Sequence, residues 1–179
     1  MAYGLMGSMG EIEFRRLNEG DAAAYWNLRY EALEREPLAF GKAAEEHRAT
    51  TVEEWADRFR EYPKESFTLG GFDGGVLAGI ATFIREQGLK ERHKGHIYGV
   101  YVSAAHRQRG FGRAMIAAVV NRAKEDVTLE QILLAVGACQ EAAIRLYRGS
   151  GFEVYGTEPR ALKVGSRYVD EHQMMLRVR

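Results

Sequence analysis

The 179-residue chain has only one cysteine and three prolines. Because Cys139 has no second cysteine to pair with and no Cys/His group shows zinc spacing, we expect a cytoplasmic, metal-free protein. No apolar run approaches the roughly 20 residues that a membrane-spanning helix needs. An excess of charge is also lacking, since 25 Lys and Arg balance 25 Asp and Glu. We therefore expect neither nucleic acid nor a membrane as a partner.

Hydrophobic residues make up 46% of the chain, which is enough for one globular domain with a substantial core. No Pro/Ser-rich or low-complexity linker divides it, so we expect a single domain over residues 11–179. The first ten residues, MAYGLMGSMG, lack the basic start and long apolar run of a signal peptide. We expect residues 1–10 to be a flexible terminus or an expression remnant outside the fold.

Hydrophobic periodicity predicts an α/β fold, a mixed sheet of six to seven strands with helices on both faces. Asn18 or Asp21 can cap the first helix. The composition Asp73-Gly74-Gly75 favours a hairpin turn. A strand, a helix and a further strand over residues 95–136 form a βαβ unit, for which parallel pairing is expected. The predicted strands cover residues 11–17, 66–72, 75–85, 95–102, 129–136, 152–155 and 168–178. The first predicted helix runs from its cap to about residue 34, and the others cover residues 52–60, 112–124 and 141–148.

Residues 100–113, VYVSAAHRQRGFGR, run from an apolar strand through a Gly-x-Gly turn into a helix-forming segment. Gly110 and Gly112 permit a tight turn whose N–H groups point at one spot, and the positive end of the helix dipole adds to it. Charge around that spot comes from Arg107, Arg109 and Arg113. The pattern is typical of a pyrophosphate cradle and predicts a phosphorylated cofactor; the alternative is a strand-to-helix turn that binds no ligand.

Two motifs carry a resemblance. Residues 107–112, RQRGFG, have the form Arg/Gln-x-x-Gly-x-Gly/Ala, and residues 140–152, QEAAIRLYRGSGF, have the form Asn-x-x-Ala-x-x-Leu-Tyr-x-x-x-Gly-Phe with Gln in the place of Asn. With these motifs one strand apart, the chain resembles the GNAT superfamily of acyl-CoA-dependent N-acetyltransferases over nearly all of residues 11–179. The resemblance implies a GNAT-like fold whose central βαβ unit carries the acetyl-CoA site.

The same resemblance implies which residues bind acetyl-CoA. The main chain of one strand segment would pair with the pantetheine amides and polarise the thioester, although these residues also suit an ordinary core strand: Val100, Tyr101 and Val102. Backbone N–H groups of the turn would bind the pyrophosphate: Arg107, Gln108, Arg109, Gly110, Phe111, Gly112 and Arg113. Gln140 and Ala143 would also contact the cofactor, and Gln140 is a poor helix cap.

Catalytic roles follow from the resemblance and from acid–base chemistry. Tyr147 would donate a proton to the departing thiolate, since a phenol with a pKa of about 10 lies above a thiol of about 8.5; the alternative is a tyrosine that anchors its helix to the sheet. His96 and Tyr98 lie on one face of their strand and share parity with Val100 and Val102. His96 would accept the ammonium proton directly or through water, Tyr98 would hold a water or contact substrate, and a structural role for both stays open.

The acceptor pocket is expected from the first two helices and their connection, although a plain packing role suits the same pattern. The cluster comprises Trp26, Arg29, Tyr30, Glu31, Pro37, Phe40 and Gly41. Arg29 or Glu31 could bind a charged acceptor. A surface role is expected for Asp170, Glu171 and His172, and a small buried or half-buried one for Cys139.

The residues thus predict an N-acetyltransferase in which a primary amine, small-molecule or peptide, attacks acetyl-CoA directly. A non-catalytic acyl-CoA-binding or sensing module is the alternative. A third class, another nucleotide-binding fold, lacks its motifs here, since neither Gly-x-Gly-x-x-Gly nor Gly-x-x-x-x-Gly-Lys-Ser/Thr is present. An exposed edge at the C-terminal strands allows a homodimer.

Overall fold

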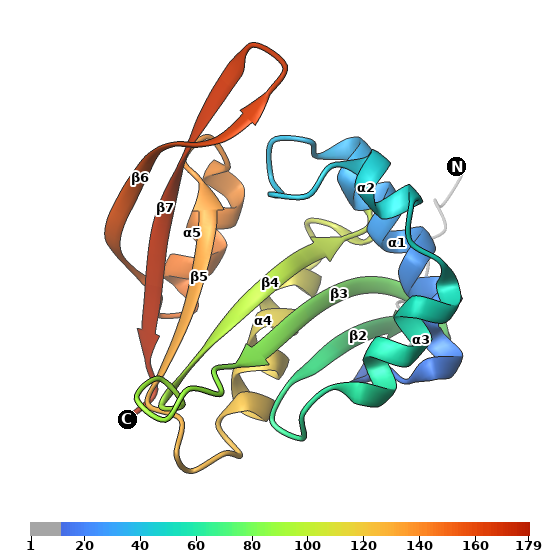
Figure 1. The fold of residues 1–179 in the computed structure, drawn as a ribbon, viewed down its shortest axis with the longest axis horizontal. Coiled ribbons are helices and arrows are strands. Elements are labelled where there is room, and N and C mark those ends of the chain that lie inside the picture. The colour runs from blue at the N-terminus through green and yellow to red at the C-terminus, as the bar shows by residue number, and fades with distance from the viewer. Residues whose placement is uncertain (1–11) are drawn as a thin grey trace, which may run out of the picture.

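The computed structural model of the chain describes residues 12–179, and the segment 1–10 that we expected outside the fold falls outside the described residues. Seven strands form one sheet in the order β1-β2-β3-β4-β5-β7-β6 (Figure 1). The strands are β1 (Ile12–Arg16), β2 (Phe67–Asp73), β3 (Val76–Arg85), β4 (Lys94–Val102), β5 (Gln131–Gly137), β6 (Glu153–Val164) and β7 (Arg167–Arg177). The helices are α1 (Ala22–Arg35), α2 (Ala44–Arg48), α3 (Val52–Glu61), α4 (Phe111–Ala123) and α5 (Glu141–Gly149), with 3-10 turns at Glu19–Asp21 and Ala104–His106.

The strand pairing confirms the mixed sheet. Among the strands of residues 12–179, β4 and β5 pair in parallel across the α4 crossover, and the other neighbours are antiparallel. Gly74 and Gly75 join β2 to β3 with φ angles of 56° and 84°, the left-handed pair that a tight hairpin requires. The predicted hairpin and βαβ unit are both confirmed.

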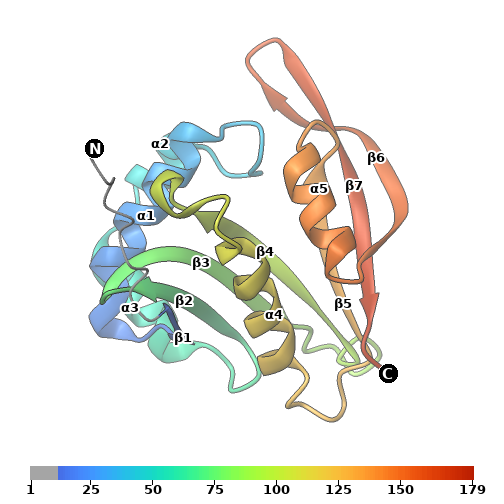
Figure 2. The ribbon, with the colours of Figure 1, turned by 180° about the vertical axis from the view of Figure 1, so that it is seen from behind.

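Helices cover both faces of the sheet. Figure 1 shows α1 and α3 in front of it, and the reverse view in Figure 2 shows α4 and α5 on the other side. Tyr25, Trp55 and Phe59 pack together between α1, α3 and the sheet. Phe111 and Met115 of α4 are buried in a second core on the opposite face. Burial of such side chains contributes about 1.5–3 kcal/mol each, so both faces stabilise the sheet.

Helix α2 was not predicted, because its five residues, AEEHR, are too few and too polar to show a period. It forms through local and tertiary contacts. The Ala43 N–H donates to the Glu46 carboxylate at 2.8 Å. His47 is fully buried, and its ring stacks 5.0 Å from Trp26. Tertiary packing thus supplies what the sequence pattern lacks.

Strand β6 runs to Val164, well past the predicted end at Tyr155, and forms a long hairpin with β7 (Figure 1). Its pairing slips twice, after Val154 and after Glu158. Arg160 takes a left-handed φ of 54°, and its N–H donates to the Asp170 carboxylate at 2.7 Å. These irregularities interrupt the alternation of apolar and polar residues along β6, so the sequence pattern does not indicate its outer half.

Candidate active site

Strand β4 carries a bulge at Gly99, in the middle of the predicted site. Gly99 has a φ of 61°, a left-handed conformation that favours glycine. The partners of Tyr98 and Tyr101 on β3 lie two residues apart, although the tyrosines themselves are three apart. Because side chains alternate along a strand, the additional residue exchanges the two faces of β4 beyond this point.

The bulge corrects one expectation from the sequence. His96 and Tyr98 do share a face, and their rings stack with centroids 5.7 Å apart and planes 13° apart. Val100 and Val102 were expected on that face by parity, but they pack against the core beneath α4. Tyr101 instead points into the core beneath α1 and α3. The parity argument is wrong here because it assumes an unbroken strand.

Strands β4 and β5 pair at one end and then diverge (Figure 1). The pairing ends where His96 lies opposite Leu133, so the later part of β4 has no strand partner on this side within residues 12–179. A cavity of about 400 Å³ lies beyond that point. The α1–α2 loop, the bulged part of β4, the end of β5, the middle of β7, and α5 form its wall. Its lining residues are Arg29, Ala39, Phe40, Gly41, Lys42, Ile97, Tyr98, Gly99, Val100, Ala135, Val136, Gln140, Ala143, Tyr147 and Glu171.

The predicted cradle is a loop with two left-handed residues that leads into α4. Gln108 and Gly110 have φ angles of 63° and 78°. None of the N–H groups of residues 108–113 donates to a backbone carbonyl in the described part of the chain. A Cβ added to Gly110 would meet no atom of residues 12–179 within 4 Å, and the side chains of Arg109 and Arg113 are exposed. Free amides, open space and two cations at a helix N-terminus fit a pyrophosphate.

Arg107 does not belong to this cradle. Its own N–H donates to the Ala104 carbonyl at 3.5 Å. Its guanidinium donates to the Val102 carbonyl at 2.9 Å and to the Glu36 carboxylate at 2.8 Å, and it lies 5.2 Å from the Tyr101 ring centroid. These contacts favour a structural role for the Arg107 side chain, which ties the end of β4 to the end of α1, over the expectation that it lends its charge to the phosphate.

A histidine bridge, which the sequence analysis missed, holds the turn that precedes the cradle. His106 Nδ1 lies 2.7 Å from Ser103 Oγ, and His106 Nε2 lies 3.3 Å from the Asp73 carboxylate. The ring also packs against Phe111 at 5.9 Å. The bridge joins the cradle loop to the β2–β3 hairpin, and no local motif announces it because Asp73 and His106 are far apart in the sequence.

Tyr147 and Ala143 line the cavity from one face of α5, one helical turn apart. Tyr147 is 7% exposed and packs edge-on against Phe152 at 6.0 Å. Burial raises the pKa of the Tyr147 phenol, which keeps the hydroxyl protonated. Gln140 lines the same cavity, and its side chain makes no capping hydrogen bond, as expected of a glutamine at this position.

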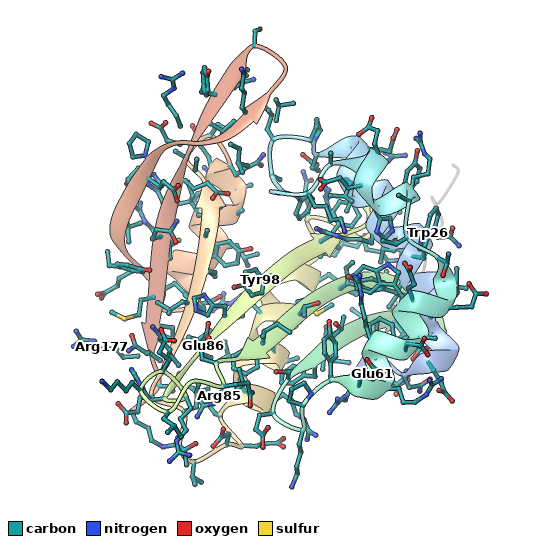
Figure 3. The ribbon with its side chains drawn as sticks, in the orientation of Figure 1. Trp26, Glu61, Arg85, Glu86, Tyr98 and Arg177 are labelled. Atoms are coloured by element: carbon teal, nitrogen blue, oxygen red, sulfur yellow. The ribbon has the colours of Figure 1, made fainter. Side chains whose placement is uncertain are left out.

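Of the two candidates on β4, Tyr98 lines the cavity and His96 does not. Figure 3 shows Tyr98 at the opening between β4 and β5, with Glu86 below it. His96 Nε2 lies 3.2 Å from the Glu86 carboxylate. Since a carboxylate accepts, Nε2 carries the hydrogen and Nδ1 is left as the acceptor. Burial lowers the pKa of His96 against the opposing effect of Glu86, which keeps the imidazole neutral.

Only part of the expected acceptor cluster reaches the cavity. Arg29, Phe40 and Gly41 line it. Glu31 does not, because it accepts a hydrogen bond of 2.8 Å from the Tyr101 hydroxyl. The structure thus separates the two charged candidates, placing Arg29 at the cavity and Glu31 in a contact between α1 and β4.

The remaining members of the cluster lie outside the lining of this cavity. Trp26 and Tyr30 stack with centroids 5.5 Å apart, and the Trp26 indole N–H donates to the Thr50 carbonyl at 2.9 Å. Pro37 lines a neighbouring groove between the α1–α2 loop and the tip of the β6–β7 hairpin. For Trp26 the amphipathic-helix interpretation therefore holds.

Two charged residues of the cavity escaped the sequence analysis. Glu171 was expected at the surface, but it lies opposite Gly137 at the end of β5 and lines the cavity. Burial, followed by the nearby Glu158 carboxylate, raises the pKa of Glu171. Lys42 enters from the α1–α2 loop. Cys139, expected to be buried or half-buried, is exposed. Glu171 could have been placed at the cavity only from the register of β7 against β5.

Two further findings concern residues 12–179 as a whole. They contain no helix with both the length and the apolar character to cross a membrane. They also contain no group of three or more His, Cys, Asp or Glu side chains arranged to hold a metal ion.

Comparisons with known proteins agree with this geometry. Residues 26–152 match the sequence model of the Acetyltransferase (GNAT) family. The chain is 22% identical over 122 residues to the L-amino acid N-acetyltransferase AaaT of Escherichia coli (strain K12), a match that covers 67% of this chain and 73% of that protein.

Solved structures share the fold. A GNAT-family acetyltransferase from Streptococcus pneumoniae superposes with a TM-score of 0.83 at 22% identity, covering 94% of this chain and 100% of that one. The structure of yncA from Salmonella typhimurium with its cofactor acetyl-CoA superposes with a TM-score of 0.81 at 21% identity, covering 95% of both chains.

Because the family model spans most of the sequence, the chain belongs to the GNAT acetyltransferase family. It is an N-acetyltransferase, and acetyl-CoA is its acyl donor. The resemblance in the two sequence motifs and the expected fold are both confirmed.

Proposed function

We propose that this chain acetylates a primary amine by direct attack on acetyl-CoA, inside the cavity between the α1–α2 loop, β4 and α5. One observation carries the proposal: the free edge of β4 borders the cavity with Tyr98 and Tyr147 and leads along the chain to the free amides of residues 108–113. We further propose that residues 11–179 form the single catalytic domain.

Binding of the acyl donor falls to the main chain. The N–H groups of residues 108–113 would hold the pyrophosphate, with Arg109 and Arg113 adding charge. The main chain of residues 100–102 would pair with the pantetheine arm as an additional strand pairs with a sheet edge. Gln140 and Ala143 would contact the donor from α5.

The chemical step forms a bond between the amine nitrogen and the acetyl carbonyl carbon and breaks the carbon–sulfur bond. Backbone N–H groups near the Gly99 bulge would stabilise the charge that develops on the thioester oxygen. Tyr147 would transfer its hydroxyl proton to the departing thiolate and later regain a proton from solvent. The raised pKa of Tyr147 supports this role, since only the protonated phenol can donate.

The attacking amine must first lose a proton. Because Tyr98 lines the cavity and His96 is stacked behind it, we assign Tyr98 to hold a water molecule that takes this proton. His96 Nδ1 would accept the proton from that water, while Glu86 fixes the ring through Nε2. His96 would therefore act through water rather than by direct contact with the amine.

The proposal also covers the acceptor, the cellular location and the oligomeric state. The name of the relative AaaT, an L-amino acid N-acetyltransferase, supports a small-molecule amine. A single cysteine supports a cytoplasmic location. Strand β6 lies at the edge of the sheet, where it could pair with a second copy, and sedimentation of the purified protein tests that dimer.

Thiol release tests the function. Purified protein with acetyl-CoA and a panel of amines should release CoA only when an amine is present, and the acetamide should form in equal amount. Calorimetry with acetyl-CoA is run in parallel. Protein that binds acetyl-CoA but releases no thiol with any amine would be the non-catalytic binding module instead.

A further inference from the structure

Arg29 is a cation without a counter-charge in the wall of the cavity. Its Nη1 is buried and has no hydrogen-bond partner within the described residues. Its guanidinium lies 4.4 Å from the centroid of the Phe40 ring. Burial, which removes water from around the guanidinium, lowers the pKa of Arg29. Taking such a charge out of water without a partner is costly, so the fold gains nothing from it by itself.

The guanidinium lies next to the place where the reaction is proposed to occur. A Cβ added to Gly99, at the bulge of β4, would lie 3.4 Å from Arg29 Nη1. Arg29 belongs to α1, which packs on the face of the sheet opposite the α4 core. The pyrophosphate cradle lies at the start of α4, so Arg29 faces the acceptor side of the cavity rather than the phosphate side.

A charge of the opposite sign lies in the same wall. Glu171 lines the cavity from β7, and no ion pair joins it to Arg29 within residues 12–179. Lys42 adds a second cation on the loop that carries Phe40, but it also borders the neighbouring groove. A cavity that holds a separated cation and anion complements a ligand with both charges.

We propose that the acceptor is a zwitterion, an amino acid, whose carboxylate binds the guanidinium of Arg29 and whose ammonium group faces Glu171. This inference rests on the proposed acetyl transfer and names its substrate class. The planar guanidinium matches a carboxylate with two parallel hydrogen bonds, and Phe40 fixes its plane. An amine without an anionic group, such as a polyamine, would leave Arg29 unpaired and be rejected.

Amino acids and their carboxamides test the inference, because the two differ only in the anionic group. With the wild-type protein, kcat/KM from thiol release should be about 100-fold or more higher for an L-amino acid than for its amide. Arg29→Met should remove this preference and leave acetyl-CoA affinity unchanged by calorimetry. Arg35→Met, on the exposed side of the same helix, is the matched control and should keep the preference.

Two measurements distinguish loss of the carboxylate site from loss of folding and from loss of turnover. Arg29→Met should melt at or above the wild-type temperature, because it removes an uncompensated buried charge. Calorimetry with CoA-saturated protein should detect binding of the amino acid but not of its amide, whether or not turnover occurs. Glu171→Gln should weaken the binding of amino acids about tenfold or more, and Glu153→Gln, exposed on β6, should not.

The outcomes separate the two proposals. Equal rates and equal binding for amino acids and amides, or a preference that survives in Arg29→Met, would overturn the zwitterion inference while leaving acetyl transfer intact. Binding of amino acids by protein that never releases thiol would instead overturn the proposed acetyl transfer and leave the carboxylate site standing.

Discussion

The guanidinium of Arg107 donates a hydrogen bond of 2.8 Å to the carboxylate of Glu36. This contact indicates that Arg107 serves as a structural link, and we predict that it contributes little to phosphate binding. We predict that Arg107→Met lowers the free energy of unfolding by about 0.5–1 kcal/mol, since the pair is partly exposed. Urea unfolding of Arg107→Met, Glu36→Gln and the double variant measures the coupling.

For Arg109→Met we expect a loss of acetyl-CoA affinity without a loss of stability. Acetyl-CoA affinity should fall, and its dependence on salt should weaken, because a cation at the cradle is lost while stability is unchanged. Calorimetry at two salt concentrations checks this. An Arg107→Met variant that loses more affinity than Arg109→Met would contradict the division between the two arginines.

Gly110 and Gly165 both have left-handed φ angles, 78° and 60°, and a Cβ on either would meet no atom within 4 Å in the part of the chain that the structure describes. Valine at either position should therefore cost about 1–2 kcal/mol of stability from backbone strain. Only Gly110→Val should abolish acetyl-CoA binding, because Gly165 lies at the tip of the β6–β7 hairpin. Retained affinity in Gly110→Val would remove the phosphate assignment.

Regular features of the fold could be predicted from the sequence. The βαβ unit and the β2–β3 hairpin follow from periodicity and from Gly74-Gly75, which are local signals. Helix α2 and the outer half of β6 depend on contacts such as His47 with Trp26 and Arg160 with Asp170. Neither contact leaves a periodic trace, so the sequence alone did not indicate them.

The site divides in the same way. The cradle glycines and Tyr147 belong to compact motifs, so the sequence alone could propose them as site residues. The Gly99 bulge exchanges the faces of β4, so a parity argument places Val100 and Val102 on the wrong side. Glu171 reaches the cavity only through the register of β7 on β5, which no stretch of sequence encodes by itself.

Tyr147→Phe should reduce kcat about 100-fold or more while acetyl-CoA affinity changes little, because the proton donor is lost and the ring remains. Since burial raises the pKa of Tyr147, the wild-type phenol should stay protonated at alkaline pH. We therefore expect no fall in kcat up to about pH 10 from this group. Thiol-release assays from pH 6 to 10 measure both effects. An unchanged kcat in Tyr147→Phe would show that Tyr147 is not the acid.

His47 predicts how stability depends on pH. It is fully buried, its Nε2 donates to the Trp26 carbonyl at 2.9 Å, and burial lowers its pKa below 6.5. The unfolded chain therefore binds a proton more readily than the native one, so stability is full above about pH 6.5 and falls as the pH drops below it. Melting curves from pH 8 to 5 should show this fall, and His47→Gln should flatten it. An equal slope in the variant would assign the effect to other groups.

Gly137 allows the α1–α2 loop to lie against the end of β5. A Cβ there would lie 3.2 Å from the Leu38 carbonyl oxygen and 3.3 Å from Val169, so valine must displace the loop or the sheet. We predict a loss of about 1–3 kcal/mol in Gly137→Val from this overpacking. Because the same loop carries Phe40 against Arg29, KM for the acceptor should rise more than KM for acetyl-CoA. Gly156→Val, where a Cβ meets nothing within 4 Å, is the control and should leave both unchanged; an equal rise in the two KM values of Gly137→Val would mean that the loop serves the whole site rather than the acceptor side.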